Sequence, residues 1–394
     1  MKLTVYLHQN KRHKLGVLAE IDKKIYFEYD KAFLESGIEV SPFKLPLKNG
    51  VIQCNDSPYE NLFGVFADSL PDGWGRLLID RELIKQGKNP NLLSPLERLK
   101  FVGCAGMGAL EYEPFIRERK ETQKIVLKEL ANNSLKILEE DVNINLEEFI
   151  TLGGSSAGAR PKILAQIDKT GKKIYSSNIP LKEKFKHYII KFASSFDGIE
   201  SGKIEFAYSK MAKKAGIEMS DTLLLEDKYF AIERFDREGE QKIHMHSFAG
   251  LVHSDFRYPT LDYDDLLKVT ALLTKDINEV KKAFRIAVFN LLTYNRDDHA
   301  KNFSFLMDNQ KRWHLTPAYD LTFSLGMNGE HSMMYMGEGR NPTTKELLLL
   351  GKKHKISDAN LIIKEIKDVV KRWGFIAHEC GVSKAKIDSI QKFI

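Results

Sequence analysis

Short runs rich in apolar, β-branched and aromatic residues occur along the chain up to about residue 236. Runs of this kind, bounded by turn-forming residues, are typical of β-strands. They predict strands at residues 3–7, 24–29, 163–167, 187–192 and 228–235. A helical spacing of apolar residues predicts a helix at 205–215, so the first part of the chain is expected to mix strands with a few helices.

The pattern becomes helical beyond Pro259. Apolar residues then repeat at steps of three and four, first at Leu266, Val269 and Leu273 and again at Phe284, Val288 and Leu291. Few strand-like runs follow. A β-rich part followed by a helix-rich part predicts an α+β fold and disfavours a doubly wound sheet.

Domain boundaries are predicted from changes in composition. Residues 1–112 have the pattern of a small α+β unit with a turn-rich centre at 68–75. A stretch rich in lysine, arginine and glutamate follows, and residues 131–134 are predicted to be a helix end or a linker. We therefore expect a boundary near residue 115 and a division into 1–115, 116–257 and 258–394.

The overall composition excludes a disordered or collagen-like chain. Of the 394 residues, 43% are hydrophobic, which is ample for sizeable cores. The formal net charge is +6, and residues 351–394 contain ten basic and five acidic side chains, so most of that charge lies in this last segment. This concentration of positive charge could bind an acidic partner or nucleic acid. It is explained at least as well by the solvated face of a terminal helix.

The three cysteines lie far apart, and none has the spacing of a zinc site or a Cys-x-x-Cys pair. They predict a reducing compartment. The first seven residues have only a short apolar stretch before a polar run, which predicts a first strand and no secretion signal. Because no apolar stretch is long enough to cross a bilayer, we expect a cytoplasmic protein with no membrane partner.

The clearest candidate chemistry lies in the run NRDDHAKNF at residues 295–303. Asp297 and Asn302 have the spacing of the protein-kinase catalytic loop, in which the aspartate takes the proton of the substrate hydroxyl and the asparagine holds a metal ion. Asp320 follows a β-like turn, where a kinase has a further metal-binding aspartate. Oxygen ligands of this kind suit Mg²⁺. The same residue types are also common as helix caps and in solvated turns.

A glycine-rich segment, LGGSSAGARPK, lies upstream at residues 152–162. Its small residues Ala157, Gly158 and Ala159 would let backbone amides approach phosphate oxygens, and Lys162 could add a positive charge. No Gly-Lys-Ser or Gly-Lys-Thr follows the turn, so a Walker-type P-loop protein is disfavoured. The alternative interpretation is a flexible glycine linker.

Two predicted strand ends extend this pattern. Lys191 resembles the strand lysine that contacts nucleotide phosphates in kinases, with Glu205 on the next helix as its ion-pair partner. Glu233 and Phe235 lie where a hinge would meet adenine through backbone groups and an aromatic face. Each of these also fits an ordinary strand end. The glycine-rich segment, the strand lysine, the helix glutamate, the hinge strand and the Asp and Asn residues follow one another in the order found in kinases. This order is more informative than any one of these motifs.

The chain resembles the HipA family, the kinase toxins of bacterial type II toxin–antitoxin modules. The resemblance rests on the runs GSSAGARPK at 154–162, IERFDR at 232–237, DDHAKNFS at 297–304 and LTPAYD at 315–320. It covers nearly the whole chain, since FGVFADSLPDGWG at 63–75 looks like part of the family's N-terminal subdomain. It implies an α+β, protein-kinase-like two-lobe fold, with a β-rich N-lobe and an all-α C-lobe preceded by a small α+β N-terminal subdomain.

The resemblance also implies an ATP- and Mg²⁺-dependent Ser/Thr protein kinase that phosphorylates a component of translation, such as an aminoacyl-tRNA synthetase. The family's roles would fall on Asp297 as catalytic base and on Asn302 and Asp320 as Mg²⁺ ligands. The implied nucleotide contacts are Ser155, Ser156, Ala157, Gly158, Ala159, Lys162, Lys191, Glu233 and Phe235.

Regulation and partners are implied in the same way. Autophosphorylation would modify Ser155, or its neighbour Ser156, and silence the enzyme, because a phosphate dianion cannot share a pocket built for the ATP phosphates. The implied partners are a helix-turn-helix, HipB-like antitoxin and, through it, operator DNA.

The sequence departs from the family pattern at two places, and two alternative functions are also considered. Residues 244–249 read HMHSFA, where many relatives have a Gln-Glu-Asp run. Asp298 stands where several relatives have glycine, so repulsion could raise the pKa of this carboxylate or its neighbour unless magnesium neutralises it. The alternative functions are a catalytically weak, nucleotide-binding corepressor of an antitoxin and a phosphotransferase for lipid or small-molecule hydroxyls.

Overall fold

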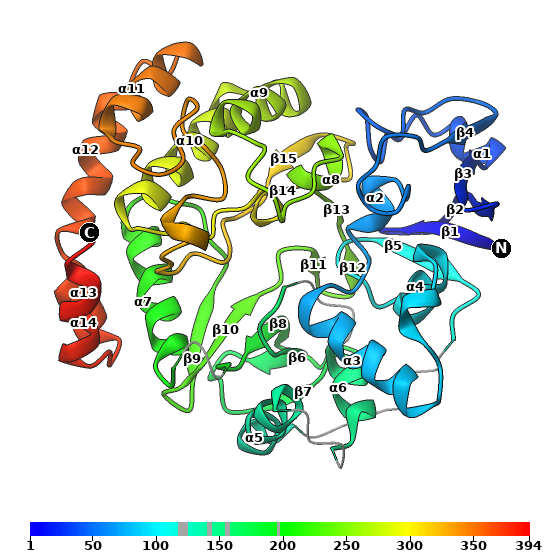
Figure 1. The fold of residues 1–394 in the computed structure, drawn as a ribbon, viewed down its shortest axis with the longest axis horizontal. Coiled ribbons are helices and arrows are strands. Elements are labelled where there is room, and N and C mark those ends of the chain that lie inside the picture. Colours follow the sequence, from blue (N-terminus) through cyan, green and yellow to red (C-terminus); the bar gives the residue numbers. More distant parts are fainter. Residues whose placement is uncertain (117–124, 140–143, 154–157, 195–197) are drawn as a thin grey trace. The chain divides into compact units, whose positions relative to one another are not determined.

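The N-terminal part of the chain is built on an antiparallel sheet with the strand order β4-β3-β2-β1-β5 (Figure 1). The computed structural model describes residues 1–116, 125–139, 144–153, 158–194 and 198–394. The strands are β1 (Lys2–His8), β2 (Arg12–Ile21), β3 (Lys24–Tyr29), β4 (Val51–Gln53) and β5 (Leu110–Glu113). The alternation in β1 buries Leu3, Val5 and Leu7. The predicted strands at 3–7 and 24–29 are confirmed.

Aromatic side chains form the core beside this sheet. The ring of Phe27 lies 4.8 Å from Tyr29 and 5.1 Å from Phe66, measured between centroids. The helices of this part are α1 (Lys31–Leu34), α2 (Gly64–Ala67), α3 (Gly73–Lys85), η1 (Pro90–Leu92) and α4 (Pro95–Val102). A capping box of Ser94 and Glu97 satisfies backbone amides at the start of α4.

A second antiparallel sheet contains several of the predicted nucleotide contacts. Its strands β7 (Ile174–Ser176), β6 (Lys162–Asp168), β8 (Phe185–Lys191) and β10 (Tyr229–Glu233) pair in that order. They confirm the strands predicted at 163–167, 187–192 and 228–235. Helix α6 (Leu146–Gly153) leads into the glycine-rich segment.

Helix α5 (Leu127–Leu138) corrects one prediction. It runs through residues 131–134, which the sequence pattern assigns to a helix end or a linker. Leu130, Ala131 and Ile137 are buried, and the hydroxyl of Ser134 donates to the carbonyl of Ala131 at 2.8 Å. Burial of the apolar side therefore outweighs the low helix propensity of the Asn-Asn-Ser sequence.

The chain divides into two units, each discontinuous in sequence. The first contains residues 1–199, 229–246 and 250–253, and the second contains 200–228, 247–249 and 254–394. The sequence-based division near residues 115 and 257 stays a prediction.

The second unit is mainly helical, and α7, α9 and α10 confirm the three helices predicted from apolar spacing. Its helices are α7 (Ser201–Lys214), α9 (Tyr263–Thr274), α10 (Ile277–Leu292), η2 (Ala300–Asn302), η3 (Met327–Gly329), α11 (Thr344–Lys353), α12 (Ala359–Val370), α13 (Trp373–Glu379) and α14 (Lys384–Gln391). It also contains β9 (Thr222–Leu225) and an antiparallel hairpin of β14 (Ser304–Met307) and β15 (Trp313–Leu315). The remaining short elements are β11 (Arg237–Glu238), β12 (Gln241–Lys242), β13 (His244–Ser247) and α8 (Phe248–Val252).

The basic C-terminal segment forms amphipathic helices (orange to red in Figure 1). In α12, Ile362 and Ile366 are buried while Lys364 and Lys367 are exposed. The concentrated positive charge therefore lies on a solvated helix face. Across the described ranges, every helix is too short or too polar to span a bilayer.

Candidate active site

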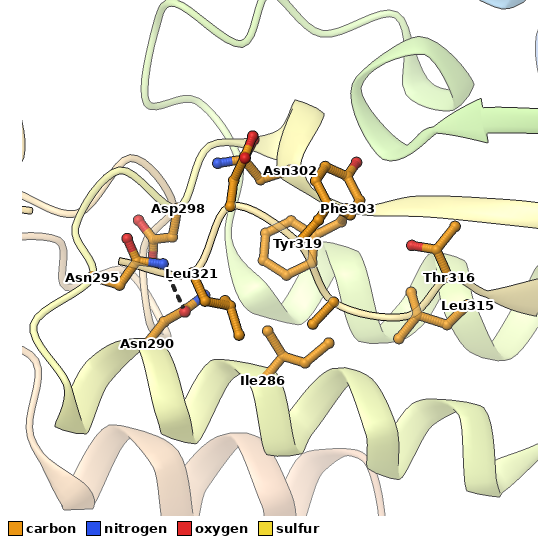
Figure 2. Close-up of a pocket in the computed structure, with 12 residues that line it drawn as sticks. Ile286, Asn290, Asn295, Asp298, Asn302, Phe303, Leu315, Thr316, Tyr319 and Leu321 are labelled. Atoms are coloured by element: carbon orange, nitrogen blue, oxygen red, sulfur yellow. Dashed lines mark hydrogen bonds between the residues drawn. The ribbon is translucent and has the colours of Figure 1, made fainter. Parts of the chain in front are cut away.

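A pocket in the second unit brings together residues from α10, the segment 295–303 and the segment after β15 (Figure 2). Asn302 and Asp320, the two predicted metal ligands, both line it. The other lining residues are Ile286, Asn290, Asn295, Asp298, Phe303, Leu315, Thr316, Ala318, Tyr319 and Leu321. Two polar groups that lie 18 positions apart in sequence thus meet in one concave site.

Asp297 is not one of the residues that line the pocket, and its side chain is exposed. The side-chain amide of Asn302 donates to the backbone carbonyl of Asp297 at 2.8 Å. This hydrogen bond uses the amide nitrogen and leaves the Asn302 side-chain oxygen available for a cation. The same bond ties Asn302 to the residue predicted to be the base.

Asp298 has a different environment from its neighbour. Its side chain is completely buried, and its Oδ2 atom accepts hydrogen bonds from the Tyr263 hydroxyl and His331 Nδ1, each at 2.9 Å. Its Oδ1 atom accepts from the backbone amides of Ser332 at 2.9 Å and Met333 at 3.4 Å. Asp298 is therefore a buried acceptor that holds residues 331–333 to the segment 295–303.

A chain of hydrogen bonds connects this carboxylate to the pocket wall. The Asn295 side-chain amide donates to Asn290 at 3.0 Å, and the Asn290 amide donates to the Tyr263 hydroxyl at 2.9 Å. Burial, with the adjacent charge of Asp298, raises the pKa of Tyr263, so its hydroxyl stays protonated and donates. The Oδ1 atom of Asn295 is buried in the pocket and has no hydrogen-bond partner in the part of the chain that the structure describes.

The segment that carries Asp320 is fixed by its neighbour. The Tyr319 hydroxyl donates to the carbonyl of Lys301 at 2.8 Å and lies 2.6 Å from the Ser304 hydroxyl. Asp320 itself has a φ of 53°, in the left-handed region that residues other than glycine rarely adopt. Strained backbone of this kind persists only where the surroundings impose it, and it is common at functional sites.

The donor set of the pocket fits a hard divalent cation. Asp320 offers a carboxylate, and Asn302 and Asn295 offer amide oxygens, of which the Asn295 oxygen is buried and unsatisfied within the described ranges. Mg²⁺ prefers oxygen ligands of this type.

In the first unit, Lys162 and Lys191 are direct partners in the pairing of β6 with β8. Residues directly opposite each other point to the same face of a sheet, so the two ammonium groups lie on one face. Lys162 is buried, and the Lys191 ammonium lies 5.7 Å from the ring centroid of Phe230. Lysine ammonium groups bind phosphate as point charges, so an anion such as phosphate could bind at this face.

The other predicted contacts are spread over both units. Glu233 ends β10 and pairs with the Lys186 ammonium at 2.8 Å, while Phe235 follows it half-buried. Glu205 is buried on α7 in the second unit, and its ion pair with Lys191 stays a prediction. Ser155, Ser156 and Ala157 lie outside the described residues, whereas Gly158 and Ala159 are described.

The histidine departure at 244–246 has a structural explanation. His246 lies 2.6 Å from the Asp68 carboxylate through Nδ1 and 3.0 Å from the Ser41 hydroxyl through Nε2. His244 Nε2 lies 2.9 Å from the Val40 carbonyl, and burial lowers the pKa of His244 to about 4, so the ring is neutral and donates. Both histidines therefore fasten β13 to N-terminal residues of the first unit.

Cys54, Asp56 and His253 form a cluster that their sequence positions did not indicate, with candidate ligand atoms within 4.8 Å of one another. The Gly64 amide donates to His253 Nε2 at 3.0 Å, which keeps the ring proton on Nδ1, 3.2 Å from Asp56. Burial raises the pKa of the Cys54 thiol to about 11. A metal needs a thiolate and an imidazole lone pair, so this hydrogen-bond pattern disfavours a metal site.

Sequence reasoning missed the residues that support the predicted site. Tyr263, His331 and Tyr319 hold the segment 295–303 through contacts that span 18 to 35 positions. Asp72 lies in the turn-rich run at 68–75, and its carboxylate accepts a hydrogen bond from the Gly158 amide. The only available signal was the concentration of turn residues at 68–75.

Comparisons with known proteins agree with this architecture. Residues 3–113 match the HipA N-terminal domain, and residues 154–373, more than half of the chain, match the HipA-like C-terminal domain. Putative kinase Y4dM of Sinorhizobium fredii (strain NBRC 101917 / NGR234) is 29% identical over 185 residues. That match covers 42% of this chain and spans 44% of the length of Y4dM.

Among solved structures, the fold is similar to that in the Shewanella oneidensis MR-1 HipA, HipB and operator DNA complex. The TM-score is 0.70 at 19% identity, over 99% of this chain and 94% of that chain. The Helicobacter pylori proinflammatory kinase CtkA matches 53% of this chain and 88% of its own at 14% identity, and its TM-score of 0.36 is too low to carry an argument. The likeness to the Shewanella protein confirms the predicted α+β, kinase-like two-lobe fold. Because both of its domains match and the fold is shared, the chain belongs to the HipA family.

Proposed function

We propose that this protein is an ATP- and Mg²⁺-dependent Ser/Thr protein kinase that acts as a toxin. The observation that carries the proposal is the pocket in which Asn302 and Asp320 meet, with Asn302 bonded to the exposed residue Asp297. The name of the relative Y4dM, which is that of a kinase, supports the same activity.

In this proposal Asp297 accepts the proton of the substrate hydroxyl. Its exposed carboxylate can reach an incoming protein side chain, whereas both oxygens of Asp298 already accept hydrogen bonds in a buried site. The two adjacent aspartates therefore have different roles in this proposal: Asp297 accepts the proton, and Asp298 holds the segment 295–303 in position.

The nucleotide contacts proposed for this chain are those that the family resemblance implies. Asn302 and Asp320 would hold Mg²⁺, which when bound supplies neutralisation of the phosphate charge. Lys162 and Lys191 would contact the phosphates from one face of the β6–β8 pair, and Glu233 and Phe235 would border adenine. The glycine-rich residues Ser155, Ser156, Ala157, Gly158 and Ala159 complete the proposed nucleotide contacts.

We also propose the family's regulation and partners for this chain. Phosphorylation of Ser155 or Ser156 would silence the enzyme by adding a dianion next to the ATP phosphates. A helix-turn-helix, HipB-like antitoxin would bind the kinase and connect it to operator DNA. The similar Shewanella structure, which contains HipA, HipB and operator DNA, supports this assignment. The proposed target is a component of translation such as an aminoacyl-tRNA synthetase.

Transfer of labelled γ-phosphate from ATP to the protein itself and to proteins of a bacterial lysate tests the activity. With Mg²⁺, the wild-type protein should label itself and a lysate protein, and Asn302→Ala and Asp320→Asn should each reduce labelling by about a hundredfold or more. Asp388→Asn, on the exposed side of α14, changes charge outside the pocket and should label normally. Full labelling in the two pocket variants would contradict the proposal, and labelling of lipid or small molecules alone would reassign the acceptor.

A further inference from the structure

Three large apolar side chains are exposed close to the proposed base, Asp297. Leu325, Met327 and Phe393 expose 51%, 77% and 45% of their surface, and we call these three residues the apolar patch. All of them belong to the second unit, as does Asp297. Single exposed apolar residues are common on proteins, whereas a group of them at one place is typical of an interaction surface.

Backbone hydrogen bonds place Leu325 next to the segment that carries Asp297. The Ser324 amide donates to the Tyr294 carbonyl at 3.1 Å, and the Arg296 amide donates to the Ser324 carbonyl at 3.2 Å. Leu325 directly follows Ser324, and Asp297 directly follows Arg296. The exposed leucine and the proposed base are therefore each one position from the same bonded pair of residues.

Met327 is held against the same arginine. The Arg296 guanidinium donates to the carbonyl of Gly329, two positions after Met327. Gly326 directly precedes Met327, and a Cβ atom at Gly326 would lie only 2.7 Å from the Arg296 Cβ atom. The backbone on both sides of this methionine is thus fixed, although its side chain extends into solvent.

Phe393 completes the patch through aromatic contacts. Its ring centroid lies 4.9 Å from that of Tyr294 and 5.4 Å from that of Phe323. Tyr294 and Phe323 stack on each other with 6.0 Å between centroids. The three rings therefore connect Phe393 to the two segments that carry Asp297 and Leu325.

The position of the patch indicates what it binds. A substrate hydroxyl must come within hydrogen-bond distance of Asp297 to give up its proton. Each residue of an extended peptide advances the chain by about 3.3 Å, so the residues next to the acceptor must pass over surfaces adjoining Asp297. An apolar side chain of the substrate gains free energy by leaving water at such a surface.

We infer that the apolar patch binds the acceptor segment of the protein substrate, through a large apolar side chain within two positions of the phosphorylated serine or threonine. This inference rests on the proposed kinase function and adds a sequence preference to it. The residues that determine the preference are Leu325 and Met327, supported by Phe393.

Paired substitutions test the patch. Leu325→Asp with Met327→Asp removes its apolar character, and Leu325→Met with Met327→Leu preserves it. Leu272→Asp is the matched control, because Leu272 is 57% exposed on α9 and lies outside the patch. The probe is a bacterial lysate with γ-labelled ATP and Mg²⁺. The readouts are the labelling rate at increasing lysate concentration, the labelled sites by mass spectrometry, the affinity for a non-hydrolysable ATP analogue, and sedimentation velocity.

The double aspartate variant should label lysate protein about tenfold more slowly than the wild type at low lysate concentration, and high concentration should restore the rate, because acceptor binding is weakened. Its affinity for the analogue, its melting temperature and its sedimentation should match the wild type. The apolar double variant and Leu272→Asp should label normally. The wild-type sites should have Leu, Ile, Met, Val or Phe within two positions of the labelled residue.

Equal labelling by the double aspartate variant and the wild type would overturn the inference. So would a lost rate that high lysate concentration does not restore, or labelled sites without an apolar neighbour. A change in sedimentation of the double aspartate variant would reassign the patch to a contact between copies of this chain and overturn the inference as well. A wild-type protein that labels no protein would instead refute the proposed kinase function.

Discussion

At the scale of single residues, two adjacent aspartates show how environment separates roles. Asp297 is exposed, and Asp298 is completely buried among four hydrogen-bond donors. These donors compensate the negative charge of Asp298, so repulsion between Asp298 and the proposed base Asp297 is reduced.

Removal of the buried carboxylate should affect stability strongly. Asp298→Ala leaves the Tyr263 hydroxyl, His331 and the Ser332 amide without their acceptor, and we expect a loss of about 3 kcal/mol in the free energy of unfolding. Asp297→Ala, at an exposed position, should change it by less than about 0.5 kcal/mol. Urea denaturation followed by circular dichroism measures both, and equal unfolding midpoints for the two variants would contradict the assignment.

The sequence could identify the candidate site residues but not the residues that hold them in place. The spacing of Asp297 and Asn302 is local, so it is visible in the chain order. The contacts of Asp298 with Tyr263 and His331 depend on how distant segments fold together. Hydrophobic periodicity along the chain does not indicate such contacts. The contact of Asp72 could not be predicted for the same reason, because its partner Gly158 lies 86 positions away.

At the scale of elements, the pairing of β6 with β8 sets two lysines side by side. Lys162 and Lys191 are opposite in register, and Phe230 of β10 is opposite Lys191 on the other side. A polyphosphate anion should bind at this face, because the two ammonium groups attract phosphate oxygens.

Tripolyphosphate should therefore raise the melting temperature of the wild-type protein by about 3 °C at saturation. Lys191→Met should lose most of that shift. Lys186→Met is the matched control, because Lys186 lies on the same strand but points to the opposite face, towards Glu233. Differential scanning fluorimetry gives the shifts, and equal responses of the two lysine variants would exclude this anion site.

The edge strand β5 is tied to β1 and to residue 242 by a buried carboxylate, Glu111. Burial raises its pKa, but the Lys242 charge and hydrogen bonds from Lys242, His8 and Arg12 outweigh this and lower the pKa to about 2. A carboxylate with a lowered folded-state pKa stabilises the protein above its unfolded pKa and loses that effect as the pH falls towards the folded value.

Glu111→Gln should therefore lower the free energy of unfolding by roughly 2 kcal/mol at pH 6. The difference from the wild type should shrink steadily between pH 5 and about pH 2, because the wild-type carboxylate also becomes protonated there. Urea unfolding at a series of pH values measures this. A difference that stays constant over the whole series would mean that Glu111 contributes through packing alone.

The elements with the clearest local patterns were predicted, and two that were missed or cut short have physical causes. The predicted strands in both sheets and the helices α7, α9 and α10 are present. Strand β2 was not predicted, because its first residues, Arg12, His13 and Lys14, are polar and exposed and hide the alternation that follows. Helix α5 was cut short in the prediction because asparagine and serine have low helix propensity, which tertiary burial overrides.

At the scale of the whole molecule, chain order and spatial grouping differ. Residues 229–246 rejoin the first unit after residues 200–228 have entered the second. Hydrophobic periodicity reports which face of an element is buried but not which distant element covers it, so this exchange could not be predicted from the pattern. Local patterns predicted the α+β class, and the order of the weak motifs, with the family resemblance that they support, added the kinase-like two-lobe fold.

The most direct test of the kinase proposal is self-labelling with γ-labelled ATP and Mg²⁺, followed by mass spectrometry of the modified residue. The wild-type protein should carry the label on Ser155 or Ser156. Asp297→Asn should reduce the labelling rate by a factor of about a thousand, because the proposed base is lost, while binding of the nucleotide is retained. Labelling of Asp297→Asn at the wild-type rate, or a wild-type protein that binds ATP and Mg²⁺ but transfers no phosphate to any protein, would contradict the proposal.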